Sequence, residues 1–302
     1  MKTPLLAALA GLLLGGLPAA ADPVDQVSLQ GVIDFHAHSA PDVTGRSIDS
    51  FGVIRNAKAA GMRAVVLKNH YFPTAAIAQL AMMEVSGVEV FGGVVLNRSN
   101  GGINPEAVRK MVEVEGHRGR VVWCPTFDAE NQVRFERASR PFVAVVRDGR
   151  PVPAMEEVFK VVADHDLIFA TGHSAPAESI ILLRAARAAG VRRLLVTHVL
   201  SASTRASIDQ MRQMAAEGAL LEVVYLAHLG GDPLPMSACA RAIRAVGAGH
   251  FIMSSDLGQP GNPLHTRGLR EFISRLRAEG ITDEEIALIT RKNPARLLGL
   301  DS

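Results

Sequence analysis

From Gly31 onward the chain alternates short apolar runs with longer amphipathic segments, and this alternation constrains its fold more than any other feature. The apolar runs are rich in Val, Leu and Ile and lack polar alternation, which is typical of strands covered on both faces. Eight of them are expected to be strands, at residues 32–35, 64–67, 88–96, 121–125, 167–170, 194–197, 220–225 and 251–254. Eight such strand and helix units predict one parallel (β/α)8 TIM barrel of the α/β class, with a doubly wound open sheet as the structural alternative.

The expected helix boundaries support the same count, because glycine readily adopts the left-handed conformation that often closes a helix. Seven glycines follow amphipathic segments in this way: Gly61, Gly87, Gly116, Gly190, Gly218, Gly247 and Gly280. Helix starts are predicted at Asn104-Pro105, at Ala175-Pro176 and at the capping box that begins with Thr282. One domain, residues 22–302, accounts for all of these units.

The first 21 residues are expected to lie outside this domain. Lys2 precedes an apolar stretch from Leu5 to Leu17, which is too short to span a bilayer, and small residues follow up to Ala21. This order is typical of a signal peptide cleaved after Ala21. Residues 22–302 are therefore predicted to form a periplasmic or secreted protein, and no membrane partner is expected, because no later apolar run is long enough to span a bilayer.

Composition excludes one class of partner. The chain of 302 residues is 48% hydrophobic and 21% charged, with a formal net charge of +2, which is ordinary for a globular protein. Its Lys and Arg residues are scattered rather than gathered in a stripe, so nucleic acid is not expected to bind. Cys124 and Cys239 lie in apolar contexts and are expected to be buried free thiols. The expected partner is a small molecule, and the sequence is compatible with a homo-oligomer.

One segment, residues 127–153, interrupts the alternation between the fourth strand and its helix. Asp148-Gly149 lies between apolar residues, which predicts a β-hairpin. On a barrel this insertion would lie over the carboxyl ends of the strands. It would act there as a lid over a site or be a tolerated surface insertion, and the sequence leaves both interpretations open.

Polar residues follow several of the expected strands, at the end where barrel enzymes build their sites. His36 and His38 end the first strand and, being two residues apart, lie on one face of it. Such a pair alone is weak support for a metal site, but His173, His198 and Asp256 end the fifth, sixth and eighth strands in the same way. Four histidines and one carboxylate form a ligand set for a borderline metal ion such as zinc.

This arrangement resembles, strand by strand, the metal site of the amidohydrolase superfamily. The sequence NPARLLGL at residues 293–300 is similar to the final helix of those enzymes. His36 follows the expected cleavage site too closely for the β-sandwich domain that some members carry. The chain therefore looks more like the compact branch of the superfamily, and the resemblance covers nearly all of residues 22–302.

The resemblance implies one or two divalent transition-metal ions, with Zn²⁺ the first expectation. With one ion, His36, His38, His173 and Asp256 would hold it, and His198 would polarise the substrate carbonyl. With two ions, His173 and His198 would hold the second. In both cases Asp256 would orient a metal-activated water and accept its proton.

The chain departs from the superfamily pattern at the fourth strand, which ends without the carboxylated Lys or the Glu of two-metal members. The second strand instead ends in Lys68, whose charge would be costly there unless it were paired or removed. Three roles stay open for Lys68: a carbamate that bridges two metal ions, a cation that binds an anionic substrate, or a side chain that reaches the rim of the barrel.

Further polar residues near the strand ends are weaker candidates, because polar loop residues are often only solvated. Those that could contact substrate are Asp42, Arg46, His70, Asn97, His228 and His265. Asp34 is not assigned a catalytic role.

The resemblance implies a metal-dependent hydrolase that acts on an amide, ester, lactone or related bond of a small molecule. Metal-assisted decarboxylation uses similar residues, so a carboxy-lyase is the alternative enzyme. A non-catalytic exported protein that binds a metal or a ligand is the alternative from another class. Asp256 argues against it, because a pure binding site needs no base beside the metal.

Overall fold

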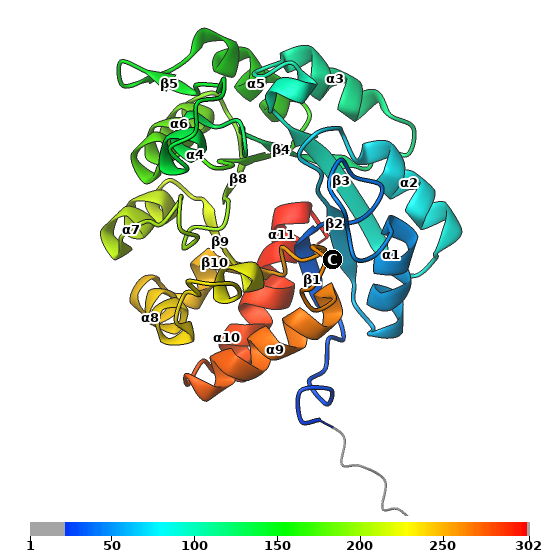
Figure 1. Ribbon diagram of the computed structural model, residues 1–302. Helices are drawn as coiled ribbons and strands as arrows, with labels where there is room; N and C mark the ends of the chain where they lie inside the picture. Colours follow the sequence, from blue (N-terminus) through cyan, green and yellow to red (C-terminus); the bar gives the residue numbers. More distant parts are fainter. Residues whose placement is uncertain (1–21, 301–302) are drawn as a thin grey trace, which may run out of the picture.

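Eight parallel strands lie side by side in the order in which they occur along the chain, and helices surround them (Figure 1). The computed structural model describes residues 22–300, so the expected signal peptide, residues 1–21, lies outside the described residues. The first and last strands approach each other where the Leu257 carbonyl accepts a hydrogen bond from the His38 amide, 2.8 Å away. The predicted TIM barrel is confirmed, with strands β1 (Ile33–Ala37), β2 (Ala64–Leu67), β3 (Glu89–Val95), β4 (Gly119–Trp123), β7 (Ile168–Ala170), β8 (Arg193–Val196), β9 (Leu220–Val224) and β10 (Phe251–Ser254).

The helices begin and end close to the expected positions. The Asn104 side chain accepts hydrogen bonds at the start of α3, Thr282 caps α10, and all seven predicted glycines have positive φ. The helices are α1 (Ser50–Ala59), α2 (Ala75–Glu84), α3 (Pro105–Glu113), α4 (Glu130–Phe135), α5 (Pro153–Asp164), α6 (Pro176–Ala188), α7 (Ile208–Ala216), α8 (Met236–Val246), α9 (His265–Ala278), α10 (Asp283–Ala287) and α11 (Asn293–Leu298).

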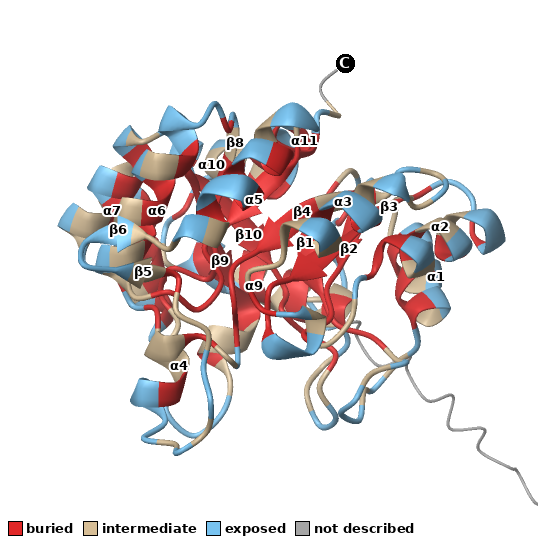
Figure 2. Ribbon diagram, turned by 90° about the horizontal axis from the view of Figure 1, so that it is seen from above, coloured by how far each residue is buried: buried red, intermediate tan, exposed pale blue. Residues whose placement is uncertain are grey.

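Alternate residues of the strands build two apolar layers. One layer lies between the strands and the helices, and the other fills the barrel with side chains such as Ile33, Val66 and Trp123. Leu297 and Leu298 of α11 belong to the inner layer, so this helix closes the amino-terminal end of the barrel. Figure 2 shows the buried strands at the centre and the exposed faces of the helices around them.

The insertion at residues 127–153 contains α4 and the predicted hairpin, formed by β5 (Val146–Arg147) and β6 (Arg150–Pro151). Figure 2 shows α4 at the end of the molecule opposite to α11. The insertion therefore lies at the carboxyl ends of the barrel strands, as expected.

Two smaller predictions concern membranes and thiols. Among residues 22–300, no helix is both long enough and apolar enough to cross a bilayer. Cys124 and Cys239 are both free and buried, as predicted. The larger of the two layers includes both sulfur-bearing side chains, so they contribute to packing.

Candidate metal centre

A β-bulge in β1 turns the first histidine into the barrel. Between Asp34 and Ala37, β1 has one residue more than the paired segment of β2. Ile33 and Phe35 belong to the inner apolar layer, so strict alternation would turn His36 outward toward the helices. The extra residue reverses this, and His36 lies inside the barrel mouth.

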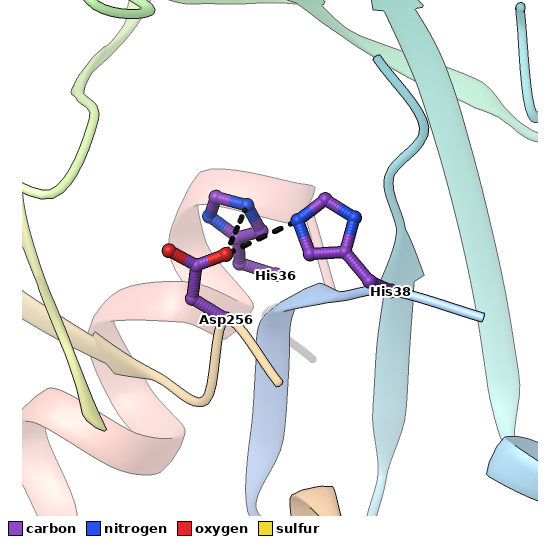
Figure 3. A group of neighbouring side chains, drawn as sticks. All are labelled: His36, His38 and Asp256. Atoms are coloured by element: carbon purple, nitrogen blue, oxygen red, sulfur yellow. Dashed lines mark hydrogen bonds and ion pairs between the residues drawn. The ribbon is translucent and has the colours of Figure 1, made fainter. Parts of the chain in front are cut away.

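His36, His38 and Asp256 form a compact cluster (Figure 3). One ligand atom from each lies within 4.8 Å of the other two, and all three residues are buried. The Asp256 Oδ1 atom lies 3.1 Å from the Nε2 atom of both imidazoles. Two ligand atoms bound to one tetrahedral zinc ion are roughly 3.3 Å apart. The spacing therefore fits a shared metal ion.

Glu222 of β9 supplies a second reason to place a cation here. Its carboxylate lies 3.3 Å from His36 Nδ1, while Asp256 lies 3.1 Å from His36 Nε2. A neutral imidazole has one N–H group and cannot donate to two carboxylates. With Nδ1–H donated to Glu222, the Nε2 lone pair faces Asp256. A cation relieves this repulsion, either the Lys68 amine, whose Nζ atom lies 3.0 Å from the same nitrogen, or a metal ion. The site therefore fits a metal ion with a carboxylate behind its histidine ligand.

Sequence reasoning missed Glu222, which lies within the apolar sequence LLEVV. It is 1% exposed, and it lies two residues after Leu220 of the inner layer, on the same inward face of the strand. A single acidic residue at an inward strand position, two residues after an inner apolar one, was the available signal. The cost of burying an unpaired carboxylate makes such a residue informative.

Lys68 lies inside the same cluster. Its Nζ atom is 3.0 Å from His36 Nε2, and the residue is 2% exposed. Burial lowers the pKa of this amine to about 8. The rim alternative for Lys68 does not hold, because the side chain ends among the buried imidazoles rather than in solvent.

Asp34 positions the segment that carries Asp256. Its carboxylate accepts hydrogen bonds from the Ser255 amide and hydroxyl, at 2.9 and 2.6 Å. Asp256 itself has a φ of 55°, a conformation that costs a non-glycine residue energy. The buried contacts of Asp34 therefore hold Asp256 in a conformation it would otherwise avoid.

His173 and His198 also line the cavity, with their ring centroids 4.8 Å apart. The Thr204 hydroxyl donates to the His198 carbonyl, so its oxygen is left to accept from His198 Nδ1, 3.4 Å away. His198 Nε2 then carries the lone pair. The ring of His198 also stacks on that of His36, at 5.9 Å, so His173 and His198 lie beside the cluster, although of the five predicted ligands only His36, His38 and Asp256 have ligand atoms within 4.8 Å of one another.

His70 presents the opposite nitrogen. The Asn97 amide nitrogen donates to Thr126 Oγ1, because the Asn97 oxygen already accepts the Thr126 amide. The Thr126 hydroxyl proton is then directed to His70 Nδ1, 2.8 Å away. His70 therefore keeps its own proton on Nε2 and lines the cavity as a donor. Asn97 does not line the cavity, but its hydrogen bonds orient Thr126 and, through it, His70.

The remaining candidates lie in different places. Arg46 lines the cavity, and its Nε donates to Asp42 at 2.6 Å. His228 packs on Phe272, with its Nδ1 atom 2.7 Å from the Leu234 carbonyl oxygen, and does not line the cavity.

His265 is buried against the Val53 carbonyl, 3.1 Å away, and lies outside the cavity too. Both His228 and His265 thus lie outside the cavity, and their predicted contact with substrate is not supported by their position.

A cavity of about 410 Å³ opens beside the cluster. Lys68, His70, His173, His198 and Asp256 line it together with apolar side chains of the insertion, Phe127 and Phe135. A larger hollow of about 780 Å³ lies at the amino-terminal end, beside Arg192 and Arg193. Barrel enzymes place their chemistry at the carboxyl end, where the imidazoles are, so the smaller cavity is the candidate site.

Burial governs the protonation of the cluster. It lowers the pKa of His38 and of His198 to about 4, and that of His70 and His173 well below the usual range. Burial alone would raise the pKa of Asp256, but the imidazoles of His36, His38 and His198 outweigh it and hold the pKa low. Neutral imidazoles beside an ionised carboxylate are the forms that bind a metal ion.

The fold and the site together define a (β/α)8 barrel with a candidate metal centre at the carboxyl ends of its strands. Residues 31–222, more than half of the chain, match the model described as "Family of unknown function (DUF6282)", and the chain belongs to this family. A comparison with curated proteins gave no match.

Solved structures share the fold at low sequence identity. A mutant of the organophosphorus hydrolase from Deinococcus radiodurans is 17% identical, with a TM-score of 0.62 over 90% of this chain and 94% of that one. A mutant of a PTE-like lactonase from the same organism is 16% identical, with a TM-score of 0.61 over 92% and 98%. A provisionally assigned 2-pyrone-4,6-dicarboxylic acid hydrolase from Pseudomonas putida is 14% identical, with a TM-score of 0.58 over 90% and 98%.

Proposed function

We propose that the protein is a metal-dependent hydrolase of the amidohydrolase superfamily. The observation that carries this proposal is the cluster of His36, His38 and Asp256, in which the ligand atoms are spaced for one ion. The names of the structural neighbours, which include an organophosphorus hydrolase and a lactonase, agree with hydrolysis. A divalent ion, with Zn²⁺ as the first expectation, would occupy this position. His173 and His198 would be further ligands, either for the same ion or for a second one.

The chain's own residues then have separate tasks. A bound divalent ion lowers the pKa of its water ligand from 15.7 to about 7. The second carboxylate oxygen of Asp256 points away from both imidazoles (Figure 3), which leaves it free to accept a proton. His70 donates its Nε2–H to the carbonyl oxygen of the substrate, whereas His198, whose Nε2 carries a lone pair, serves as a metal ligand.

The size and lining of the cavity limit the substrate to a small molecule with an apolar part. A volume of about 410 Å³ lies in the lower part of the range for small-molecule sites. Phe127 and Phe135 provide apolar surface, and Arg46 is neutralised by Asp42. We therefore favour an amide, ester or lactone whose apolar group lies against the insertion.

Lys68 would belong to the metal centre in this proposal: reaction of its neutral amine with CO₂, with loss of a proton, would give a carbamate, an anionic ligand for two ions. The support is its position, 3.0 Å from His36 Nε2 and fully inside the cluster. Lys68→Ala should then halve the metal content, and short carboxylates should restore it. If Lys68 instead binds an anionic substrate, the same variant should keep its metal and show a higher KM.

The predicted export completes the proposal. Residues 1–21 would be removed as a signal peptide, and residues 22–302 would work in the periplasm or outside the cell. Mass spectrometry of the protein from its native compartment tests this directly. A mature chain that begins at Asp22 is expected, and an intact Met1 end would contradict export.

The experiment for the function combines metal analysis with a substrate panel. Protein purified without chelators should hold one or two ions per chain, and esters, lactones, dipeptides and phosphotriesters should be assayed for hydrolysis. Asp256→Asn should fold as the wild type by circular dichroism but lose turnover, because an amide cannot accept the proton. A protein that takes up no metal on titration would contradict the proposal, and release of CO₂ from a carboxylic acid would favour the carboxy-lyase.

A further inference from the structure

The insertion is fastened to the loops that carry two of the histidines. The Asn131 side chain of α4 donates hydrogen bonds to the carbonyls of His173 and Ser203, at 3.0 and 2.7 Å. Ser203 belongs to the loop that follows β8, and His173 follows β7. Phe127 lies against His70 with the ring centroids 4.2 Å apart. The insertion is thus a wall of the site with specific polar attachments, which is more than the packing of a tolerated surface loop requires.

Gln132 connects this wall to His173 itself. The Oε1 atom of Gln132 lies 3.0 Å from His173 Nδ1, and its Nε2 atom donates to Glu136 at 2.6 Å. A carboxylate only accepts hydrogen bonds, so the amide nitrogen of Gln132 must face Glu136. Arg140 pairs with the other oxygen of Glu136, which keeps the carboxylate ionised and in place. The reverse orientation of the amide would set two oxygens against each other.

The orientation of the Gln132 amide determines which nitrogen of His173 carries the proton. The amide oxygen of Gln132 only accepts, so His173 Nδ1 must carry the proton. A neutral imidazole has a single N–H group, and the lone pair of His173 therefore lies on Nε2. In water the other tautomer of histidine predominates, so the protein selects this one.

We propose that Gln132 is a positioning residue for His173: the chain Arg140, Glu136, Gln132 holds the imidazole as its Nδ1–H tautomer and presents Nε2 to a metal ion. Part of the inference rests on the proposed function, since it needs His173 to be a ligand. The partner of a ligand histidine typically changes metal affinity by 10–100-fold when it is removed. Residues of the insertion would therefore tune the metal centre from outside the barrel.

The tautomer can be measured without any metal. Two-bond ¹H–¹⁵N spectra of the metal-free protein, labelled at histidine, report which ring nitrogen carries the proton, and the His173 signals are those lost in His173→Gln. The wild type should show His173 with its proton on Nδ1. Gln132→Met, which has a similar length but no acceptor oxygen, should shift the proton toward Nε2.

Metal affinity provides the second measurement, by competition between the protein and a coloured zinc chelator. Gln132→Met should bind Zn²⁺ ten- to a hundredfold more weakly than the wild type. The exchanged pair Gln132→Glu with Glu136→Gln keeps an acceptor beside His173 and a donor behind it, so it should return to within a few-fold of wild type. Gln213→Met, on the exposed face of α7, is the matched control and should change neither measurement.

Two results would overturn the inference. One is a wild-type His173 that carries its proton on Nε2, and the other is a Gln132→Met variant with unchanged tautomer and unchanged affinity. If Gln132→Met does not fold, the tautomer of His173 in the wild type and the zinc affinity of the exchanged pair still test the inference. Failure of the proposed function would look different, because the wild type would bind no zinc while the tautomer of His173 stayed as inferred.

Discussion

The histidines at the barrel mouth differ in what lies behind their rings, and this difference separates their roles. Glu222 stands behind His36, and Thr204 behind His198, and each leaves a lone pair on Nε2. Thr126 behind His70 leaves an N–H group instead. The residues behind these three rings, more than the histidines themselves, therefore decide which ring nitrogen carries the proton and which carries the lone pair.

Glu222→Gln tests this directly at the first ligand. The amide can present its NH2 group to His36 Nδ1, which would favour the wrong tautomer, and it removes a negative charge behind the metal. We expect zinc affinity to fall ten- to a hundredfold, with little change in the circular dichroism spectrum. Glu84→Gln, at the exposed end of α2, is the matched control. Equal affinities for the two variants would show that Glu222 does not support the ligand.

The buried ammonium of Lys68 should lower the free energy of unfolding of the metal-free protein, compared with an apolar side chain at the same position. Burial lowers its pKa from 10.5 to about 8, so keeping the ammonium below pH 8 costs about 3 kcal/mol. Metal-free Lys68→Met should therefore be more stable than wild type by about 1–3 kcal/mol at pH 7. Between pH 8 and 10.5 the unfolded chain binds more protons, so wild-type stability rises with pH and the gap narrows.

Urea unfolding at pH 7 and pH 10 measures this gap. Lys160→Met, on the exposed side of α5, controls for the loss of a lysine and should change little at either pH. A metal-free Lys68→Met that is less stable than wild type at pH 7 would mean that attraction to Asp256 and Glu222 outweighs the burial of the ammonium.

The loops at the ends of the strands position the candidate ligands, and the loop that carries His173 needs a glycine. Gly172 precedes His173 with a φ of 58°, and a Cβ atom there would lie 2.3 Å from the Cys124 carbonyl oxygen. The loop after β7 therefore packs backbone to backbone on the end of β4. This close approach fixes the position of the His173 backbone relative to the end of β4.

Gly172→Ala and Gly218→Ala together separate two costs in unfolding free energy: that of a positive φ in a non-glycine residue, and that of a clash between the added Cβ atom and the backbone. Gly218 has a φ of 87° with nothing within 4 Å, so its alanine variant should lose only about 1 kcal/mol of unfolding free energy. Gly172→Ala adds a backbone clash and should lose about 2–5 kcal/mol, with weaker zinc binding through His173. Thermal unfolding and zinc competition measure both. Equal losses would show that the approach to Cys124 relaxes freely.

Sequence reasoning predicted the elements well because buried parallel strands are continuous apolar runs, and polar residues such as His173 and Asp256 stand out at their ends. It could not predict the bulge in β1, because strand pairing is not encoded in local periodicity. It missed Glu222 because one acidic residue within an apolar strand does not change the pattern. Gln132 was invisible for another reason: its partner is 41 residues away, in a different loop.

Across the whole molecule, the two ends of the barrel are built for different purposes. The carboxyl end gathers buried polar groups such as Asp256 and Lys68, which burial penalises. The amino-terminal end is closed by α11, whose Leu298 packs with Ile33 and Val66 in the inner layer. Stability should therefore depend mainly on one end, and metal binding on the other.

Leu298→Ala tests this division. Leu298 is 2% exposed, and truncation of a buried leucine typically costs 2–5 kcal/mol of unfolding free energy, so we expect a loss of about 2–4 kcal/mol in urea. Zinc affinity of the folded variant should stay at the wild-type value, because the strands between α11 and the ligands are packed rigidly by the rest of the inner layer. Leu80→Ala, at a leucine that is 55% exposed, should lose less than about 0.5 kcal/mol and serves as the matched control. A Leu298→Ala protein that folds but binds zinc tenfold more weakly would show instead that α11 and the metal centre are coupled through the barrel interior.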